Sequence, residues 1–198
     1  MHKKRSEKGG NNIMASKEAR VYDIIDRKAG SNIAMQAISG AFGFPVTLAV
    51  DAGVVFTHYG PMLNEIRSVY GRQFINKEVV IPVIKGCKKE IMTDVVVDKI
   101  MGNIPLVGLP ANMICAKAMT WRLGILFGML AARGEEINAD SVESATQAIR
   151  KLFPQNNTFK FKKPSVTVVE KLLNIVENDT IQEFDQKVMA ILNGLQTA

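Results

Sequence analysis

Cysteine, histidine and aromatic residues are scarce in this chain of 198 residues. The two cysteines, Cys87 and Cys115, lie in separate apolar stretches and predict neither a disulfide framework nor a zinc site. The two histidines, His2 and His58, are too far apart in the sequence to predict a shared metal site. Aromatic residues make up 7% of the chain and do not alternate with basic residues, so we expect no nucleic-acid partner.

The chain also lacks the short motifs that mark common catalytic sites. It has no GxxxxGK(S/T) loop for nucleotide phosphates, and it has no HExxH, CxxC or GxSxG motif. These absences favour a non-enzymatic protein without a cofactor or a metal, which does not hydrolyse GTP on its own. No apolar run follows the charged N-terminus, so a secretory signal is not predicted and a cytoplasmic location is expected.

Hydrophobic residues, in contrast, are plentiful. They make up 47% of the chain against 22% charged residues, which is enough for one well-buried core. The formal net charge is +6, and part of it comes from residues 1–12, whose polar composition predicts a flexible basic tail. The basic side chains of this tail are His2, Lys3, Lys4, Arg5 and Lys8, against the single acid Glu7. Such a tail either aids solubility or binds anionic lipid.

Apolar residues recur at intervals of three and four along most of the chain, which predicts an all-α fold. A first helix is expected over residues 14–28, with Ser16 as a candidate cap. A second helix is expected over residues 45–70. It should be kinked at residues 60–61, a Gly-Pro pair, and should stop at Gly71.

The middle of the chain predicts two further helices separated by a turn region. Asn76 is a candidate cap for a helix that continues to Ile100, although its segment EVVIPVI is the part of the chain that most resembles a strand. Residues 102–110 contain two glycines and two prolines and predict a turn. The apolar run that follows should end at Gly134.

The C-terminal third is expected to add three helices. Asp140 and Glu143 have the spacing of a helix cap, and residues 154–163 predict an extended connector. Pro164 should open a helical hairpin over residues 164–198. The expected architecture is a bundle of about six to eight helices, in which residues 13–153 form the main helical domain.

Two segments, residues 32–56 and 102–132, predict helices that are apolar on nearly every side. Each approaches the roughly 20 residues of a membrane span, yet each is interrupted by Pro or Gly and carries charge. We expect these helices either to lie at the centre of a bundle, surrounded by other helices, or to insert into a membrane.

Charged residues inside these segments are the first candidate site. Asp51 is the one formal charge in residues 32–56, and Lys117 and Arg122 are the charges of the second segment. Because a carboxylate in apolar surroundings needs a cation, a donor or water, Asp51 is predicted to pair with Arg122 or Lys117 and to fix the register of the two helices. The alternative is that Asp51 caps or kinks a helix at a wet surface.

A candidate interface is the second site. Trp121 and Arg122 have the character of a membrane-interface anchor, because Trp favours the headgroup region and Arg can reach it. A buried Trp beside a salt-bridged Arg is the alternative. His58 and Tyr59, next to a Gly-Pro pair, predict either a hinge or partner surface or a kinked core helix.

An ordered series of features runs through residues about 29 to 134. It consists of Phe44-Pro45, Asp51, Ile66 to Tyr70-Gly71, Glu90, Ile104-Pro105 and Thr120-Trp121-Arg122-Leu123-Gly124. In this order and spacing, the features resemble the helical domain of unknown function of YcjF-type inner-membrane proteins, which also occurs at the C-terminal end of some Era-like GTPases. The resemblance implies a helical module that is often membrane-associated and often encoded beside or fused to a GTPase. Because this chain has no GTPase domain, the GTPase would be a separate chain. Residues 139–198 lie outside the resemblance.

Three hypotheses for the function follow. The first is a non-enzymatic, membrane-associated adaptor of a separate GTPase, in the cytoplasm or on the cytoplasmic face of the inner membrane, with membrane lipid as a further partner. The second is a pore-forming or membrane-inserting helical protein. The third is a soluble helical protein with an activity that its motifs do not reveal. Homo-oligomerisation is compatible with each hypothesis.

Overall fold

The computed structural model describes residues 15–39, 52–86, 108–136, 138, 141, 145, 161–178, 187 and 190. Every regular element within these residues is a helix, which confirms the all-α prediction. The described helices are α1 (Lys17–Ser39), α3 (Ala52–Val69), α4 (Lys77–Gly86), α6 (Gly108–Arg133) and α8 (Val166–Asn178). The predicted total of six to eight helices and the pairing of the C-terminal hairpin involve residues outside these ranges.

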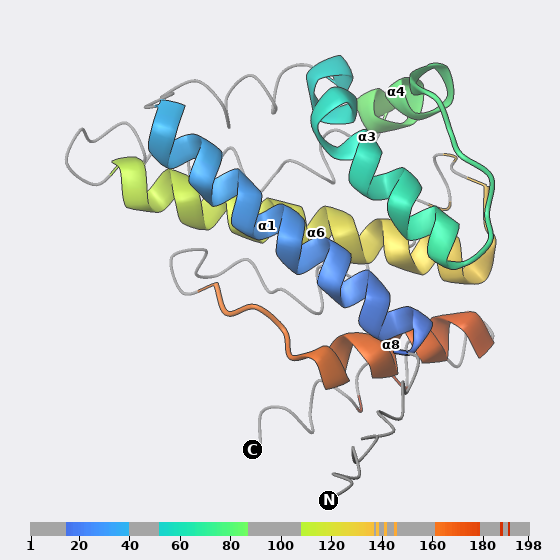
Figure 1. Ribbon diagram of the computed structural model, residues 1–198. Helices are drawn as coiled ribbons and strands as arrows, with labels where there is room; N and C mark the ends of the chain where they lie inside the picture. Colours follow the sequence, from blue (N-terminus) through green and yellow to red (C-terminus); the bar gives the residue numbers. More distant parts are fainter. Residues whose placement is uncertain are drawn as a thin grey trace, which may run out of the picture.

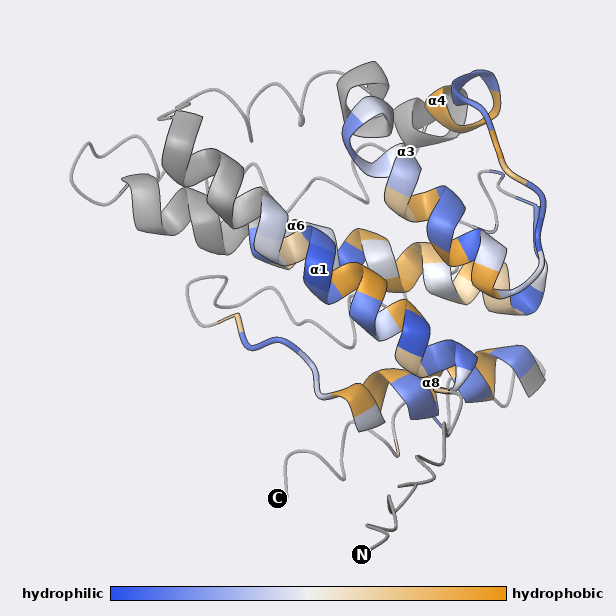
Figure 2. Ribbon diagram, in the orientation of Figure 1, coloured by the Kyte–Doolittle hydropathy of each residue, from blue (hydrophilic) through white to orange (hydrophobic). Residues whose placement is uncertain are grey.

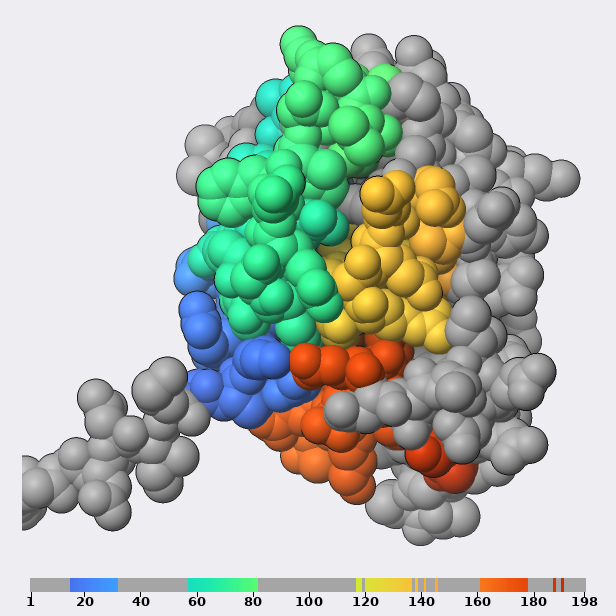
Figure 3. All heavy atoms as spheres, turned by 90° about the vertical axis from the view of Figure 1, so that its right-hand side faces the viewer, coloured from blue at the N-terminus to red at the C-terminus, as the bar shows by residue number. Residues whose placement is uncertain are grey.

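Helix α6 lies at the centre of the described bundle. α1 crosses it, and α3 and α8 pack against it on opposite sides (Figure 1). Along α1, α3 and α8, hydrophobic and hydrophilic residues share each helix, whereas residues 123–132 of α6 include no hydrophilic residue (Figure 2). From the side, residues 57–81 lie next to the C-terminal part of α6, with α8 beneath them (Figure 3). Three helices therefore contact the apolar run that forms α6.

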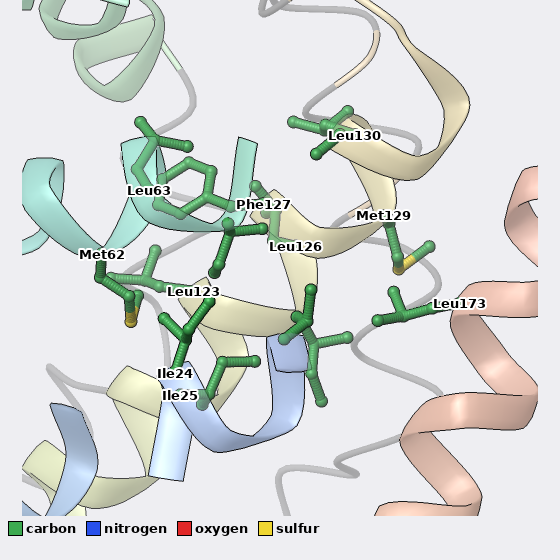
Figure 4. Close-up of a cluster of buried hydrophobic side chains, with 14 of the residues drawn as sticks. Ile24, Ile25, Met62, Leu63, Leu123, Leu126, Phe127, Met129, Leu130 and Leu173 are labelled. Atoms are coloured by element: carbon green, nitrogen blue, oxygen red, sulfur yellow. The ribbon is translucent and has the colours of Figure 1, made fainter. Parts of the chain in front are cut away.

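The side chains of these helices meet in one hydrophobic core (Figure 4). Residues 123–132 of α6 are all buried, as expected for a helix that other helices surround. The partners of α6 in Figure 4 include Ile24 and Ile25 of α1, Met62 and Leu63 of α3, and Leu173 of α8. Burying a side chain of this size stabilises the fold by about 1.5 to 3 kcal/mol. Among the described helices, none combines the length and the apolarity needed to cross a membrane.

Helix α1 begins at Lys17, directly after the predicted cap Ser16, and ends later than the sequence predicts. The backbone N of Ala19 donates to Ser16 Oγ at 3.0 Å, which confirms Ser16 as the cap. The predicted end at Lys28 is wrong, because α1 continues through Gly30 to Ser39. A single glycine costs a helix only about 1 kcal/mol, and the apolar residues that follow keep helical conformation here.

Helices α3 and α6 both end at the glycines that the sequence predicts, Gly71 and Gly134. These are positive-φ residues, with φ of 66° and 69°. After α3, the N of Gly71 donates to Ser68 O at 3.1 Å and the N of Arg72 donates to Arg67 O at 3.0 Å. The same pair of bonds closes α6, from Gly134 N to Ala131 O and from Glu135 N to Leu130 O. Both ends are Schellman motifs, in which glycine avoids the strain of a side chain at positive φ.

The structure confirms some predicted elements and corrects others. α3 continues through Pro61, as predicted for the helix over residues 45–70, and α4 is helical over the segment that most resembled a strand, which contains Pro82. Asn76 caps α4 as predicted, since it accepts from Val79 N at 3.3 Å. The turn predicted over residues 102–110 is wrong at its end, because Gly108 already belongs to α6. Pro110 is the third residue of α6. A proline is tolerated at this position, because a backbone N–H there would have no acceptor within the helix.

Two helix caps are described in the C-terminal third. The predicted Asp140–Glu143 pair falls outside the described residues and stays a prediction, while Asn138 and Ser141 form a reciprocal cap. Ser141 N donates to Asn138 Oδ1 at 2.9 Å, and Asn138 N donates to Ser141 Oγ at 3.2 Å. Helix α8 begins at Val166, two residues after Pro164, and Ser165 caps it, since its Oγ accepts from Val168 N at 3.4 Å.

Candidate functional site

The predicted ion pair of Asp51 lies outside the described residues, so it stays a prediction. Its two candidate partners are on α6, where Lys117 and Arg122 are both partly buried. The Nε atom of Arg122 is shielded from solvent in the bundle.

A buried polar contact joins α3 to α6 beside Arg122. The hydroxyl groups of Tyr59 and Thr120 lie 3.3 Å apart, and the two residues are 1% and 0% exposed. Burial raises the pKa of Tyr59 to about 12, against a smaller opposite effect of the Thr120 hydrogen bond. The phenol therefore keeps its proton at neutral pH and acts as a hydrogen-bonding group rather than as a base.

Two basic side chains flank this contact. The His58 ring meets the Tyr59 ring edge-on, with the centroids 4.7 Å apart, and Lys28 Nζ lies 5.8 Å from the centre of the Tyr59 ring. Burial, and then the charge of Lys28, lowers the pKa of His58 to about 4. Burial also lowers the pKa of Lys28. His58 is therefore expected to be neutral at pH 7.

Trp121 lies in the core rather than at the surface. It is 0% exposed and packs on Tyr22 of α1, with ring centroids 5.0 Å apart. Lys163 lies 5.6 Å from the centre of the Tyr22 ring, and it donates to both carboxylate oxygens of Asp26 at 3.0 Å. This stack joins α6, α1 and the segment before α8, and it corresponds to the buried alternative for Trp121.

The structure brings His58 and Tyr59 of α3 next to residue 120 of α6, and it buries Tyr59 and Trp121. Tyr59 contacts the residue before Trp121, and His58 stacks on Tyr59. Among the candidate residues that the structure describes, His58, Lys117 and Arg122 keep part of their surface exposed, whereas Tyr59 and Trp121 are buried. Among the described residues, no three His, Cys, Asp or Glu side chains are grouped as a metal site would require. The arrangement supplies hydrogen bonding and packing between α1, α3 and α6.

An open cleft of about 390 Å³ lies between α1 and α8. Its lining residues are Ser16, Glu18, Glu170, Lys171, Asn174 and Ile175. Ser16 Oγ donates to Glu170 Oε1 at 2.9 Å, and nearby Lys17 pairs with Glu177 at 3.0 Å. Burial, then Glu18 and Glu177, raises the pKa of Tyr70 next to this region. These contacts connect the start of α1 to α8, and they engage the carboxylates of Glu170 and Glu177.

The sequence analysis missed the chain between α3 and α4, where a large apolar side chain is exposed. Phe74 is 73% exposed, and Val79 on the first turn of α4 is 46% exposed. The signal in the sequence is an aromatic residue placed among polar ones, in GRQFINK, directly after a predicted helix stop. Such a residue in a turn has no helical stripe that would bury it.

Comparison with known proteins does not assign the chain to a family. No family model, no curated protein and no solved structure matches it.

Proposed function

We propose that the protein is a non-enzymatic helical module that associates with the cytoplasmic surface of a membrane and acts as the adaptor of a separate GTPase. The observation that carries the proposal is the enclosure of α6, whose residues 123–132 are all buried among α1, α3 and α8. The apolar run therefore holds the bundle together, which leaves partner and lipid contacts to the outer surface. The hydrogen bond between Tyr59 and Thr120 stabilises the same bundle, because it joins α3 to α6. The YcjF-like order of features supports the choice of membrane and GTPase as partners.

The proposal includes a bundle of six to eight helices that is closed by a C-terminal hairpin. Helix α8 supports this architecture, because Leu172, Leu173 and Val176 belong to the same core as α1 and α6. Lys187 and Ala190 are helical, as the second arm of a hairpin requires. Backbone NMR chemical shifts over residues 181–195 test this part, and extended or coil shifts there would contradict the hairpin.

Vesicle flotation tests the membrane part of the proposal. We expect the full-length protein to float with vesicles that contain phosphatidylglycerol and to be released in part by high salt, because basic residues near an anionic surface each contribute about 1 kcal/mol. Complete recovery in the unbound fraction at low salt would refute membrane association.

The partner is tested with a purified GTPase that is encoded next to the gene of this protein. We expect a complex whose affinity differs between the GDP-bound and GTP-bound forms, because an adaptor of a switch protein must distinguish its two states. Isothermal titration calorimetry with each form measures the difference. Absence of heat with both forms would refute the adaptor role for that GTPase.

The pore-forming hypothesis makes the opposite prediction for vesicle contents. Freeing α6 for insertion would expose the apolar faces of α1, α3 and α8, at about 1.5 to 3 kcal/mol for each large side chain that loses its cover. We therefore expect no release of an entrapped dye. Rapid release at low protein concentration would favour the pore-forming protein over the adaptor.

A further inference from the structure

The segment from Arg67 to Val79 forms the corner between α3 and α4, and its backbone is fixed on both sides of Phe74. Arg67 Nε donates to Gln73 O at 2.7 Å. On the other side, Ile75 N donates to Asn64 Oδ1 at 3.0 Å while Asn64 Nδ2 donates to Ile75 O at 3.1 Å. The residues before and after Phe74 are therefore both held by side chains of α3.

This fixed backbone turns Ile75 and Phe74 in different directions. Ile75 is partly buried against the hydrophobic core, whereas Phe74 remains 73% exposed. A mobile loop could turn Phe74 inward to reduce its contact with water, but the bonds of Gln73 and Ile75 oppose that movement. The corner thus presents an aromatic side chain to solvent at a cost in hydration free energy.

The charged residues of the α3–α4 corner are mostly basic. Arg67, Arg72 and Lys77 stand against the single acid Glu78. None of the ion pairs in the described part of the chain includes these three cations. Burial, and then the charge of Arg72, lowers the pKa of Arg67, so the two guanidinium groups lie near enough to repel each other.

Both guanidinium groups are oriented by backbone carbonyls. Arg72 Nε donates to Ala131 O at 3.0 Å at the end of α6, as Arg67 Nε does to Gln73 O. Arg72 Nη2 also donates to Ala132 O, at 3.5 Å. An Arg held in this way still has further terminal N–H groups for a second acceptor. Two guanidinium groups on the same corner are suited to an anion, since phosphate accepts from the planar fork of Arg.

We propose that the α3–α4 corner is the surface that contacts an anionic lipid bilayer, with Phe74 entering the headgroup boundary while Arg67, Arg72 and Lys77 face lipid phosphates. The inference rests on the proposed function, because it assigns the membrane contact to particular residues. An aromatic side chain surrounded by cations is the composition of interfacial binding sites on peripheral proteins. The corner runs along the edge of the molecule (Figure 1), where a flat bilayer can reach it. An acidic protein is the competing partner.

The test compares vesicles of phosphatidylcholine alone with vesicles that also contain phosphatidylglycerol. The Phe74→Ser variant should bind the anionic vesicles about tenfold more weakly, because it loses most of the apolar contact. Lys77→Gln should weaken binding about fivefold on anionic vesicles and have little effect on neutral ones. Val166→Ser is the matched control, since it removes an exposed apolar side chain from α8 at another surface, and its binding should not change.

A fluorescence measurement reports the position of the corner directly. In Phe74→Trp, the emission should shift to shorter wavelength on anionic vesicles. Trp121 contributes a constant background, because it is already fully buried. A further variant in which Lys3, Lys4, Arg5 and Lys8 are replaced by Gln controls for the basic tail. It should reduce the bound fraction but keep the shift of the protein that does bind.

The outcomes separate the two proposals. If the wild-type protein does not bind anionic vesicles, both the membrane association and the corner are wrong. If wild type and Phe74→Ser bind equally well, the corner is wrong and membrane association stands. If Phe74→Ser loses binding to the GTPase but keeps its vesicle affinity, the corner is a protein-binding surface, which also overturns the inference. Circular dichroism of each variant confirms folding, which replacement of an exposed side chain should preserve.

Discussion

The guanidinium group of Arg72 occupies the space next to Gly134 in which a side chain at position 134 would begin. A Cβ atom built on Gly134 would lie 2.6 Å from Arg72 Nη2, too close for two heavy atoms that are not bonded. Arg72 is held there by Ala131 O, so it supplies positive charge and a donor to the C-terminal end of α6. Glycine at position 134 therefore has two roles. It adopts the positive φ of the turn, and it leaves the space from which Arg72 caps α6.

Replacing each of the two turn glycines separates these roles. Gly71 has a similar φ to Gly134, but a Cβ there would meet nothing within 4 Å. Gly71→Ala should cost about 1 to 2 kcal/mol from backbone strain alone. Gly134→Ala should cost about 1 kcal/mol more, because it also displaces Arg72 from the α6 carbonyls. Urea unfolding measures both losses, and equal losses would show that the Arg72 contact contributes nothing.

Gly124 on α6 is predicted to be the least replaceable glycine of the described core. A Cβ at this position would lie 2.5 Å from Ile25 Cγ1, whereas a Cβ at Gly128 would lie 3.2 Å from its nearest neighbour, Leu173. Gly124→Ala should destabilise by about 1 to 3 kcal/mol despite the better helix propensity of alanine. Gly128→Ala should be much milder. Thermal unfolding decides the order, and the combination with Ile25→Val should recover part of the Gly124→Ala loss if the clash is the cause.

The hydrogen bond between Tyr59 and Thr120 should appear as a coupling energy. Tyr59→Phe and Thr120→Val each remove one hydroxyl from the buried contact, at about 1 kcal/mol each. The double variant should lose less than the sum of the single losses, since the second change removes a partner that is already gone. Denaturant unfolding of the four proteins measures the coupling. Additive losses would mean that the two hydroxyl groups contribute independently.

His58 should make the fold sensitive to mild acid. Its folded-state pKa of about 4 is below its ordinary value of 6.5, so the unfolded chain binds the proton more readily. Stability is therefore fully present above pH 6.5 and declines as the pH falls from 6.5 towards 4. His58→Gln should flatten that part of the stability profile, whereas the remaining acid sensitivity from carboxylates should persist. An NMR titration that gives His58 a pKa near 6.5 in the folded protein would contradict this prediction.

Exchanging the two charges tests the ion pair that is predicted between Asp51 and Arg122. Asp51→Arg and Arg122→Asp should each destabilise the protein by several kcal/mol if the two side chains pair in apolar surroundings. The double variant should recover part of the loss. If it is no more stable than either single variant, direct pairing is wrong, and the same exchange with Lys117 tests the other partner.

The sequence predicted best what depends on neighbours in the chain. Ser16, Gly71, Asn76 and Gly134 act within one helical turn, so residue type and position were sufficient to assign them. The end of α1 was missed because a glycine weakens a helix without ending it. Whether a helix passes such a residue depends on the packing that follows it.

Contacts between distant segments could not be predicted in the same way. Arg72 and Ala131 are 59 residues apart, and no local pattern marks an arginine as the cap of another helix. The candidate residues show the same limit, because Tyr59 and Trp121 were recognised as unusual but their burial depends on α1 and α6. Phe74 was overlooked since periodicity identifies side chains that share a helix face, and a single aromatic residue in a turn belongs to none.

The place of α1 in the bundle has a consequence for synthesis of the protein. α1 leaves the ribosome before α6 and α8, the helices that cover its apolar stripe. Until Leu173 and its neighbours have emerged, Val21 and Ile25 lack part of their native cover, and the growing chain exposes an apolar helix face. The bundle can therefore close only after α8 has been translated, so a nascent chain that stalls before α8 is a natural client for chaperones.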